Sequence, residues 1–400
     1  MNAKASTIIL ILLSLVFSGF YTASAQNSNS DKQSHSNYTA TSINFPFMGI
    51  IPDAQTSSMG EAGVARAPDV NSLNVNPSAV VFSPHRLSFG LSHNPWLNRL
   101  IKDMSLSYFG ASLNNGKQAI GLSLRYFAVG ETVFRNEEAV LLGMAHPREY
   151  AFDFTYARKL SPDFALGATI RYVQSRLSLN EQASAMQATA AAVAADVSAY
   201  LRKPAQLFGY PATVAAGINL SNIGPSTRTD SNEPIYLPTN LRMGTSASLE
   251  VDDLSQLTFA MDLSKMLVPA TKTTALENPG TAGFPVGMWR SFSDQPLIEE
   301  LKAISLSFGM DYSFKQQFSI RAGYHFAPQV NGTGSYPTLG AGFRYQSMQL
   351  DLAYLPGTLE KSPTANTLKI SLMFKFGALA QSRHGYISPF KKSRTKSIQQ

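Results

Sequence analysis

The alternation of apolar and polar residues between positions 302 and 377 is the feature that most constrains the fold. In the first segment, Ile304–Phe314, every second residue is apolar, and small or charged residues such as Ser307 and Asp311 lie between. A period of two is typical of a β-strand, because successive side chains point to opposite faces. Turns as short as Lys315–Gln316 separate the segments. Strands with an apolar outer face and a polar inner face predict a transmembrane β-barrel.

The same pattern can be followed along most of the chain. We predict fourteen strands, at residues 85–93, 103–113, 117–129, 150–159, 163–177, 189–201, 211–221, 238–251, 254–267, 304–314, 318–326, 339–345, 348–354 and 368–376. The connections alternate in length, since Asn114–Gly116 is a hairpin turn and Val268–Leu301 is a long loop. The predicted fold class is therefore all-β, a 14-stranded antiparallel transmembrane β-barrel with an N-terminal plug, multi-pass, with short periplasmic turns and long extracellular loops.

The composition is consistent with a wall that faces lipid. Charged residues make up 15% of the sequence and apolar residues 44%, whereas an ordinary soluble domain has roughly 25% charged residues. The formal charge is +7, but five cations and no acid follow Gly377, so most of the charge belongs to the tail. We therefore expect outer-membrane lipid, and not nucleic acid, as a partner.

The residues before the barrel predict three segments. Lys4, the apolar run Ile8–Phe20 and the sequence Ala23-Ser24-Ala25 are typical of a cleaved signal peptide. Polar residues then dominate, after which prolines and glycines interrupt any regular element. The predicted organisation is a signal peptide at 1–25, a disordered N-terminus at 26–42, a periplasmic-side plug at 43–84, an outer-membrane β-barrel at 85–377 and a basic periplasmic tail at 378–400. Export followed by membrane insertion through strands predicts the outer membrane of a diderm bacterium.

Turn and capping residues are concentrated in the plug segment. They are Pro52, Asp53, Gly60, Gly63, Asp69, Asn71, Asn76 and Pro77. Such residues satisfy backbone groups in compact loops, so a folded plug is expected. A ligand-binding loop is the alternative interpretation.

The alternation also predicts which charged residues face the lumen. They are Arg125, Asp153, Arg171, Asp196, Asp262, Asp311, Arg321, Arg344 and Asp351. These residues carry both signs, and they could line a permeation path or pair across the lumen and with the plug. Unpaired charges in an enclosed space are costly, so we expect pairing.

No sequence motif indicates catalysis. The chain has no cysteine, which excludes disulfides, thiolate metal sites and a cysteine nucleophile. It also lacks a G-x-S-x-G elbow, an H-E-x-x-H motif and a P-loop. We therefore predict a protein that is not an enzyme and that has no catalytic residues, no cofactor and no metal ligands.

Aromatic and methionine side chains are concentrated in two of the predicted outer loops. The candidates for binding another protein are Trp96, Phe284, Met288, Trp289 and Phe292. Exposed aromatic and methionine side chains are typical of partner surfaces. An interfacial girdle, or loops folded over the barrel mouth, is the alternative.

Several segments together resemble a known family. The segments are 47–54 (FMGIIPDA), 59–65 (MGEAGVA), 68–72 (PDVNS), 76–78 (NPS), 95–97 (PWL) and 124–131 (LRYFAVGE). Over residues 43–377 the chain resembles the FadL-type barrels and, more narrowly, the PorV (LptO) family of the type IX secretion system of Bacteroidetes. The plug motifs carry the resemblance more specifically than the strand pattern does.

The resemblance implies a non-enzymatic role in protein transport. A member of this family would bind the C-terminal signal domain of secreted cargo proteins at the translocon barrel and deliver them to the surface attachment complex. The alternative is a FadL-like transporter of hydrophobic small molecules, and an LPS deacylase role has also been attached to the family. The side chains predicted to face the lumen are polar and small. They would not form a hydrophobic channel for small molecules, which favours the shuttle.

Overall fold

The computed structural model describes most of the chain between the predicted plug and the last strand. The described residues are 38–39, 45–95, 103–135, 141–177, 188–225, 227–228, 234–268, 271–272, 288, 291, 303–327, 334–356 and 366–379. The predicted signal peptide, most of the predicted disordered N-terminus and nearly all of the basic tail lie outside these residues.

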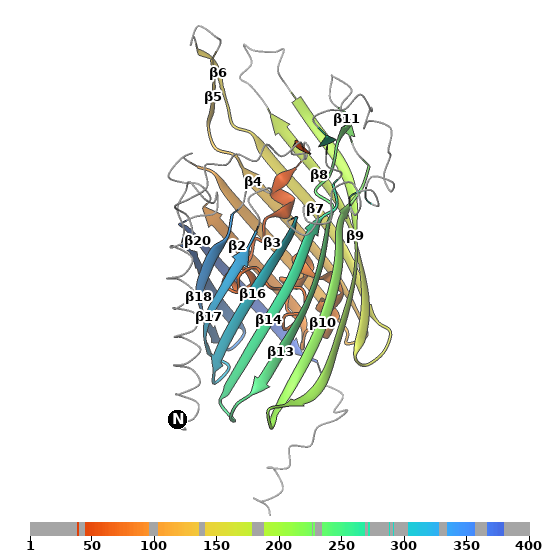
Figure 1. The fold of residues 1–400 in the computed structure, drawn as a ribbon, viewed down its shortest axis with the longest axis vertical. Coiled ribbons are helices and arrows are strands. Elements are labelled where there is room, and N and C mark those ends of the chain that lie inside the picture. The colour runs from red at the N-terminus through yellow and green to blue at the C-terminus, as the bar shows by residue number, and fades with distance from the viewer. Residues whose placement is uncertain are drawn as a thin grey trace, which may run out of the picture. The chain divides into compact units, whose positions relative to one another are not determined.

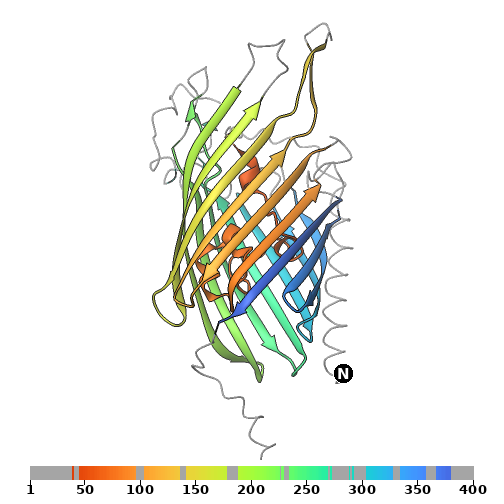
Figure 2. The ribbon, with the colours of Figure 1, turned by 180° about the vertical axis from the view of Figure 1, so that it is seen from behind.

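Fourteen antiparallel strands form one closed barrel (Figures 1 and 2). They are β2 (His85–Pro95), β3 (Ser105–Asn114), β4 (Gln118–Ala128), β7 (Arg148–Lys159), β8 (Phe164–Leu177), β9 (Ala188–Leu207), β10 (Tyr210–Ile223), β13 (Asn240–Glu250), β14 (Ser255–Met266), β16 (Ile304–Phe314), β17 (Phe318–Phe326), β18 (Tyr336–Tyr345), β19 (Met348–Leu355) and β20 (Thr367–Ala378). Strands that follow one another in the chain pair side by side, and the barrel closes where β2 pairs with β20. The predicted all-β fold, a 14-stranded antiparallel barrel, and all fourteen predicted strands are confirmed.

The largest difference from the predicted strand bounds is in β9. This strand continues to Leu207, six residues beyond its predicted end, and it stays paired with β10 through Pro204. The turn that ends it is Phe208–Gly209, in which both residues have positive φ, 53° and 82°. Two residues with positive φ are the geometry of a tight hairpin turn. Pro204 therefore lies within the strand and does not end it.

Short strands occur in segments where we expected only loops. β5 (Thr132–Arg135) pairs with β6 (Leu141–Ala145), and β11 (Thr227–Arg228) pairs with β12 (Pro234–Ile235). A separate small unit contains β1 (Tyr38–Thr39) paired with β15 (Thr271–Lys272). Among the described residues, no helix is long and apolar enough to cross a membrane.

Apolar and polar side chains alternate between the two faces of the wall. Leu122 and Leu124 of β4 are 41% and 42% exposed, whereas Ser123 between them is 2% exposed. On β7, Phe152 and Phe154 are exposed on either side of the buried Asp153. The outer surface of the barrel is therefore apolar, as a lipid-facing surface requires.

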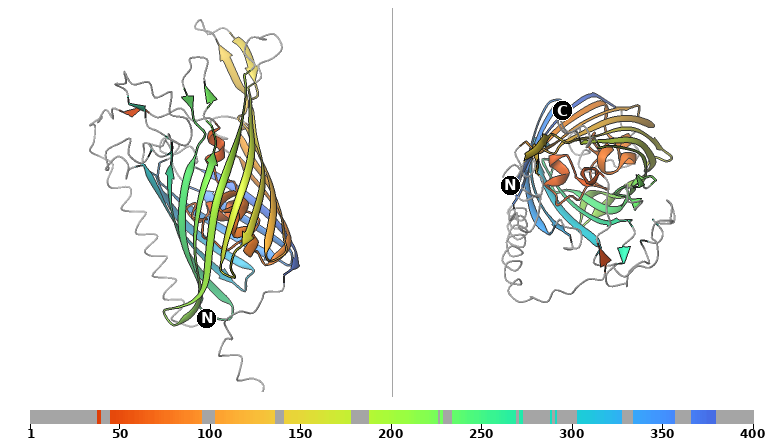
Figure 3. Two further views of the ribbon diagram at one scale, coloured as in Figure 1. Left: turned by 90° about the vertical axis from the view of Figure 1, so that its right-hand side faces the viewer. Right: turned by 90° about the horizontal axis from the view of Figure 1, so that it is seen from above.

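The plug is a chain of short helices inside the barrel, visible within the ring of strands in the right-hand view of Figure 3. It contains η1 (Pro46–Gly49), α2 (Ala54–Ser57), α3 (Ser72–Val75) and η2 (Pro77–Phe82), and most of its residues are buried. Gly60, with φ +64°, lies so close to the wall that an added Cβ would be 2.4 Å from the Phe308 carbonyl oxygen. A side chain at this position would therefore push the plug away from the wall.

Candidate functional site: the filled lumen and the outer wall

A buried charge triad joins three neighbouring strands of the wall. Arg171 of β8 donates from Nε to Asp153 Oδ1 of β7 at 2.6 Å, and from Nη2 to Asp196 Oδ2 of β9 at 3.1 Å. All three side chains are 1% exposed. Asp153 and Arg171 are direct cross-strand partners. Asn222 of β10 completes the cluster, because its side-chain oxygen accepts from Arg171 and its N–H donates to Asp196.

A second charge triad bridges across a strand. Arg321 of β17 donates from Nε to Asp311 of β16 and from Nη1 to Asp351 of β19, both at 2.7 Å. The strand in between, β18, has Gly342 at this level, and an added Cβ there would lie 2.6 Å from Asp351 Oδ1. The missing side chain of Gly342 therefore leaves the space in which Arg321 reaches Asp351.

A single aspartate of the wall binds the backbone of the plug. Asp262 of β14 accepts from the N–H groups of Gly63 and Val64 through Oδ2, at 2.7 and 2.9 Å. Buried backbone donors that lose such a partner destabilise a fold. The Asp262 carboxylate thus contributes to holding the middle of the plug against the wall.

Two cations of the wall bind the plug. Arg125 of β4 donates to the Met48 carbonyl at 2.7 Å and also to the side-chain oxygen of Asn74. Lys369 of β20 donates to the Ile51 carbonyl at 2.8 Å and to Ser57 Oγ at 2.9 Å. Both cations are buried, and the protein atoms that they contact replace their hydration.

The predicted plug residues include several that stabilise the plug itself. Asp53 caps α2 by accepting from the Thr56 N–H at 2.7 Å. Asp69 accepts from Arg66 at 2.9 and 3.1 Å and from the Asn71 N–H at 2.8 Å.

Asn76 connects the plug to the wall. Its Nδ2 donates to the carbonyls of Val64 and Ala199. Pro77 is the first residue of η2, and Pro52 is buried, with its carbonyl accepting from Asn94 of β2.

The pKa values of the two plug aspartates shift in opposite directions. Burial raises the pKa of Asp53 above its ordinary value, and the field of Arg66 offsets this only in part. Burial is also the largest single influence on Asp69 and acts to raise its pKa, but the charge and hydrogen bonds of Arg66, the charge of Lys375 and the Asn71 N–H together outweigh it, so the pKa of Asp69 lies below its ordinary value. Asp69 is therefore an ion-pair partner, whereas Asp53 loses part of its preference for the charged form.

The remaining predicted residues have varied surroundings. Arg344 is exposed at the end of β18, where it donates to Gln349 Oε1 at 2.9 and 3.1 Å. Met288 is half-buried, and its carbonyl accepts from Ser291 Oγ. The other four cargo-binding candidates, Trp96, Phe284, Trp289 and Phe292, lie outside the described residues.

Several residues that contact the plug were not among our candidates. Asn219 of β10 donates to the Val75 carbonyl at 2.9 Å, and Ser371 of β20 accepts from the Ala54 N–H at 2.8 Å. Glu61 accepts from the Tyr336 hydroxyl at 2.8 Å. The predicted lumen-facing set contains only charged residues, and the same alternation, extended to neutral polar residues of β10 and β20, also predicts Asn219 and Ser371 on the inner face.

A serine–histidine pair also lies in this region. Ser307 Oγ is 2.9 Å from His325 Nδ1, and both residues are buried in the wall. The His325 ring packs against Tyr336, which itself binds Glu61 of the plug. The pair is therefore enclosed among structural contacts.

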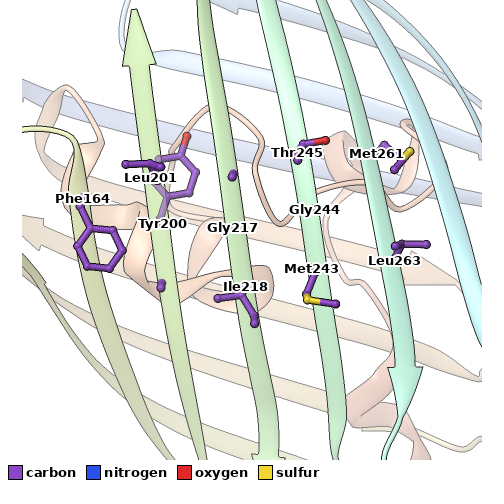
Figure 4. Close-up of a pocket in the computed structure, with 12 residues that line it drawn as sticks. Phe164, Tyr200, Leu201, Gly217, Ile218, Met243, Gly244, Thr245, Met261 and Leu263 are labelled. Atoms are coloured by element: carbon purple, nitrogen blue, oxygen red, sulfur yellow. The ribbon is translucent and has the colours of Figure 1, made fainter.

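An apolar depression of about 410 Å³ lies in the wall where β8, β9, β10, β13 and β14 pass (Figure 4). Exposed Leu201, Ile218, Met243 and Leu263 line it. Gly217 belongs to the lining, and an added Cβ there would meet plug atoms at 2.5 Å. The close approach of the plug thus requires a small residue at a position where the outer wall is hollowed.

Comparisons with known proteins gave one family and several structures. A family model described as "Type IX secretion system protein PorV" matches residues 31–273. A comparison with curated protein sequences found no match. Solved structures similar to this chain include a TodX monoaromatic hydrocarbon channel mutant, with a TM-score of 0.50, 11% identity and coverage of 83% of this chain and 100% of that chain.

Two further structures have lower scores. The Pseudomonas putida toluene transporter TodX has a TM-score of 0.48, 10% identity and coverage of 84% of this chain and 98% of that chain. A Pseudomonas aeruginosa FadL homologue has a TM-score of 0.46, 11% identity and coverage of 84% of this chain and 100% of that chain. At such identities, similarity to these channels concerns the fold alone.

Proposed function

The chain belongs to the PorV family of type IX secretion system proteins, and we propose that it is the outer-membrane shuttle of that system. In this role it binds the C-terminal signal domain of exported proteins at the translocon barrel and delivers them to the surface attachment complex. The proposed role involves binding and transfer and requires no covalent chemistry.

The filled lumen is the observation that carries this proposal. The plug is held at several levels by wall residues, including Arg125, Asp262 and Lys369. The plug obstructs a path through the lumen, since the polar wall groups that would line such a path are engaged in binding it. A barrel of this kind offers its partners its loops and its outer wall.

The barrel lies in the outer membrane, and its orientation is part of the proposal. We place the short turns, such as the one at Phe208–Gly209, in the periplasm and the long loops outside the cell. This arrangement follows the usual construction of outer-membrane barrels. The loop that contains Phe284, Met288, Trp289 and Phe292, together with Trp96, would then meet cargo at the cell surface.

Co-purification from outer membranes tests the proposal. The tagged full-length protein is extracted in mild detergent, and its partners are identified by mass spectrometry. We expect exported proteins with intact C-terminal signal domains, together with a large translocon barrel. Deletion of residues 284–292 should abolish recovery of cargo, whereas a deletion of equal length in the loop at 178–187 should not. Recovery of lipid or fatty acid alone, without protein partners, would contradict the shuttle.

A transporter of hydrophobic small molecules is the second candidate function. The apolar depression of the outer wall favours it, because a lipophilic molecule could rest between Ile218 and Met243. The depression lies on the lipid side, however, and the plug contacts Gly217 directly behind it. Substituting Ala216→Trp would fill the depression, and this candidate predicts reduced uptake of a hydrophobic probe with unchanged cargo recovery.

LPS deacylation is the least favoured candidate. It would require a nucleophile that reaches a lipid ester, whereas Ser307 and His325 are buried in the wall near the plug. Release of fatty acid from purified LPS by the wild-type protein, and its loss in Ser307→Ala, would be needed to support this function.

A further inference from the structure

Six cations lie on the inner side of the barrel at the end where the short turns are. Side chains at every second position of a strand point to the same face. Lys159 follows the buried inward Asp153 by six positions, and Arg202 follows the buried inward Asp196 by six positions, so both cations point inward. The same rule places the other four on the inner side. The six are Arg86 of β2, Lys117 immediately before β4, Lys159 of β7, Arg202 of β9, Arg344 of β18 and Lys375 of β20. We call this set the basic crescent.

The basic crescent occupies one continuous arc of the mouth. Its members belong to the stretch β18-β19-β20-β2-β3-β4-β7-β8-β9, in the order in which these strands pair around the barrel. The other strands, β10, β13, β14, β16 and β17, have the inward residues Thr213, Glu250, Gln256, Ser313 and Ser319 at the same end. By the same spacing, Lys315 immediately after β16 adds one cation to this second side, and Asp163 immediately before β8 adds one carboxylate to the first. The mouth therefore has one side with six cations and one side with a single cation.

Two members of the crescent share one aromatic ring. Lys159 Nζ and the guanidinium carbon of Arg202 lie 4.6 and 4.7 Å from the ring centroid of Phe82, the last residue of η2. Cation–π contacts are weak attractions at partly exposed sites. The ring fixes the position of the two charges without neutralising them.

Two other members share one neutral oxygen. Arg344 donates to Gln349 Oε1 at 2.9 and 3.1 Å, and Lys375 donates to the same atom at 2.8 Å. Within the part of the chain that the structure describes, neither cation forms an ion pair. The nearby carboxylates of Asp69 and Asp351 are engaged with Arg66 and Arg321.

We propose that the basic crescent binds an acidic segment of a second protein, whose carboxylates lie between these cations. Like charges gathered in a partly enclosed mouth repel one another, and a segment of opposite charge removes that repulsion and is steered to the site. The side of the membrane on which this partner meets the barrel rests on the orientation given under the proposed function.

Lipid and the chain's own tail fit the crescent less well. Lipid headgroups surround the outside of the barrel, where the exposed Arg158 and Lys203, next to Lys159 and Arg202 on the same strands, are the cations that they meet. The tail after Gly377 carries five cations and no acid. It is therefore repelled by the crescent.

Peptide binding tests the proposal directly. The full-length protein is placed in phosphatidylcholine nanodiscs, and binding of a fluorescein-labelled decaglutamate peptide is followed by anisotropy. The double variants K159Q/R202Q and R344Q/K375Q should each raise Kd by about tenfold, which corresponds to about 1.4 kcal/mol. The matched control R158Q/K203Q removes two cations from the same strand ends, on the outer face, and should change Kd less than about twofold. Heat-modifiable mobility in gels confirms that each variant is folded.

Three outcomes would overturn the proposal. They are no binding of the peptide by the wild-type protein, an equal loss of affinity in the inner and outer double variants, and binding that requires phosphatidylglycerol in the nanodisc. The first two show that no crescent site exists for a polyanion, and the third assigns the charges to lipid. Cargo recovery is measured separately, so a protein that retrieves no cargo but binds the peptide would contradict the shuttle and leave the crescent intact.

Discussion

The charge triads and the plug contacts use similar side chains for different purposes. Arg171 and Arg321 each bind two aspartates of other strands and so tie the wall to itself. Asp262 and Lys369 instead bind backbone groups of the plug. Cohesion of the wall and retention of the plug therefore depend on separate residues, although both sets lie on the inner face. The predictions below separate these two roles, from the largest expected effect to the smallest.

Removing the centre of the first triad should have the largest effect. Arg171→Ala leaves Asp153 and Asp196 buried without their partner, and breaking a buried ion pair in this way costs about 3–5 kcal/mol. We expect a correspondingly lower free energy of unfolding in urea, measured on the refolded protein in lipid vesicles. Arg158→Ala on neighbouring β7, which is exposed, serves as the control and should change it by less than about 0.5 kcal/mol. A loss in Arg171→Ala no larger than in this control would contradict the role of the triad.

Removing a plug contact should loosen the plug and leave the wall closed. Asp262→Ala takes away the acceptor of the Gly63 and Val64 N–H groups, at a cost of about 1–3 kcal/mol. Hydrogen exchange should become faster at residues 60–66, with little change in the strands around Arg171. Equal acceleration in plug and strands would show that the two roles are not separable.

Acid should weaken the plug through Asp69. Its pKa is lowered in the folded protein, so its stabilising ion pair is fully present above the unfolded value of 3.8 and is lost as pH falls through the lower folded pKa. We expect exchange in the plug to increase relative to the intrinsic amide exchange rate at each pH, that is, protection factors to fall, below about pH 4. Asp69→Asn lacks the ion pair with Arg66 at every pH. Exchange in the plug of this variant should therefore already be faster than in the wild type at neutral pH, and its further increase in acid should be smaller. An unchanged pH profile in the variant would assign the acid response to other carboxylates.

The smallest effect is expected for a single neutral hydrogen bond. Ser246 Oγ of β13 donates to the Ala65 carbonyl at 2.6 Å in a partly buried place. Ser246→Ala should cost about 0.5–1.5 kcal/mol and should accelerate exchange only around residue 65. Thr245→Ala, on the opposite face of the same strand, is the control. If Thr245→Ala lowered stability more than Ser246→Ala, the loss of stability would come from the strand itself and not from the hydrogen bond to the plug.

The strands were predictable because their signal is local. Alternation identified all fourteen barrel strands. It ended β9 before Pro204, which the strand accommodates, and it missed the short pairs β5–β6 and β11–β12. The contacts of the plug depend on residues far apart in the chain, such as Ala54 with Ser371. The partnership of Arg321 with Asp351 depends on the space over Gly342 in the strand between them, and a single sequence does not indicate which glycine will lie there.

The seam between β2 and β20 sets an order for assembly. The plug precedes β2 directly, so it leaves the translocation machinery before any strand of the wall, while β20 is the last strand to arrive. The ring cannot be completed until β20 meets β2, and a plug left outside at that moment would have to enter through one open end of the barrel. The hydrogen bond from Ala54 to Ser371 of β20 is thus made at the closing step. We therefore expect the N-terminal segment to be in place before β20 meets β2, so that filling of the lumen and completion of the ring are coupled.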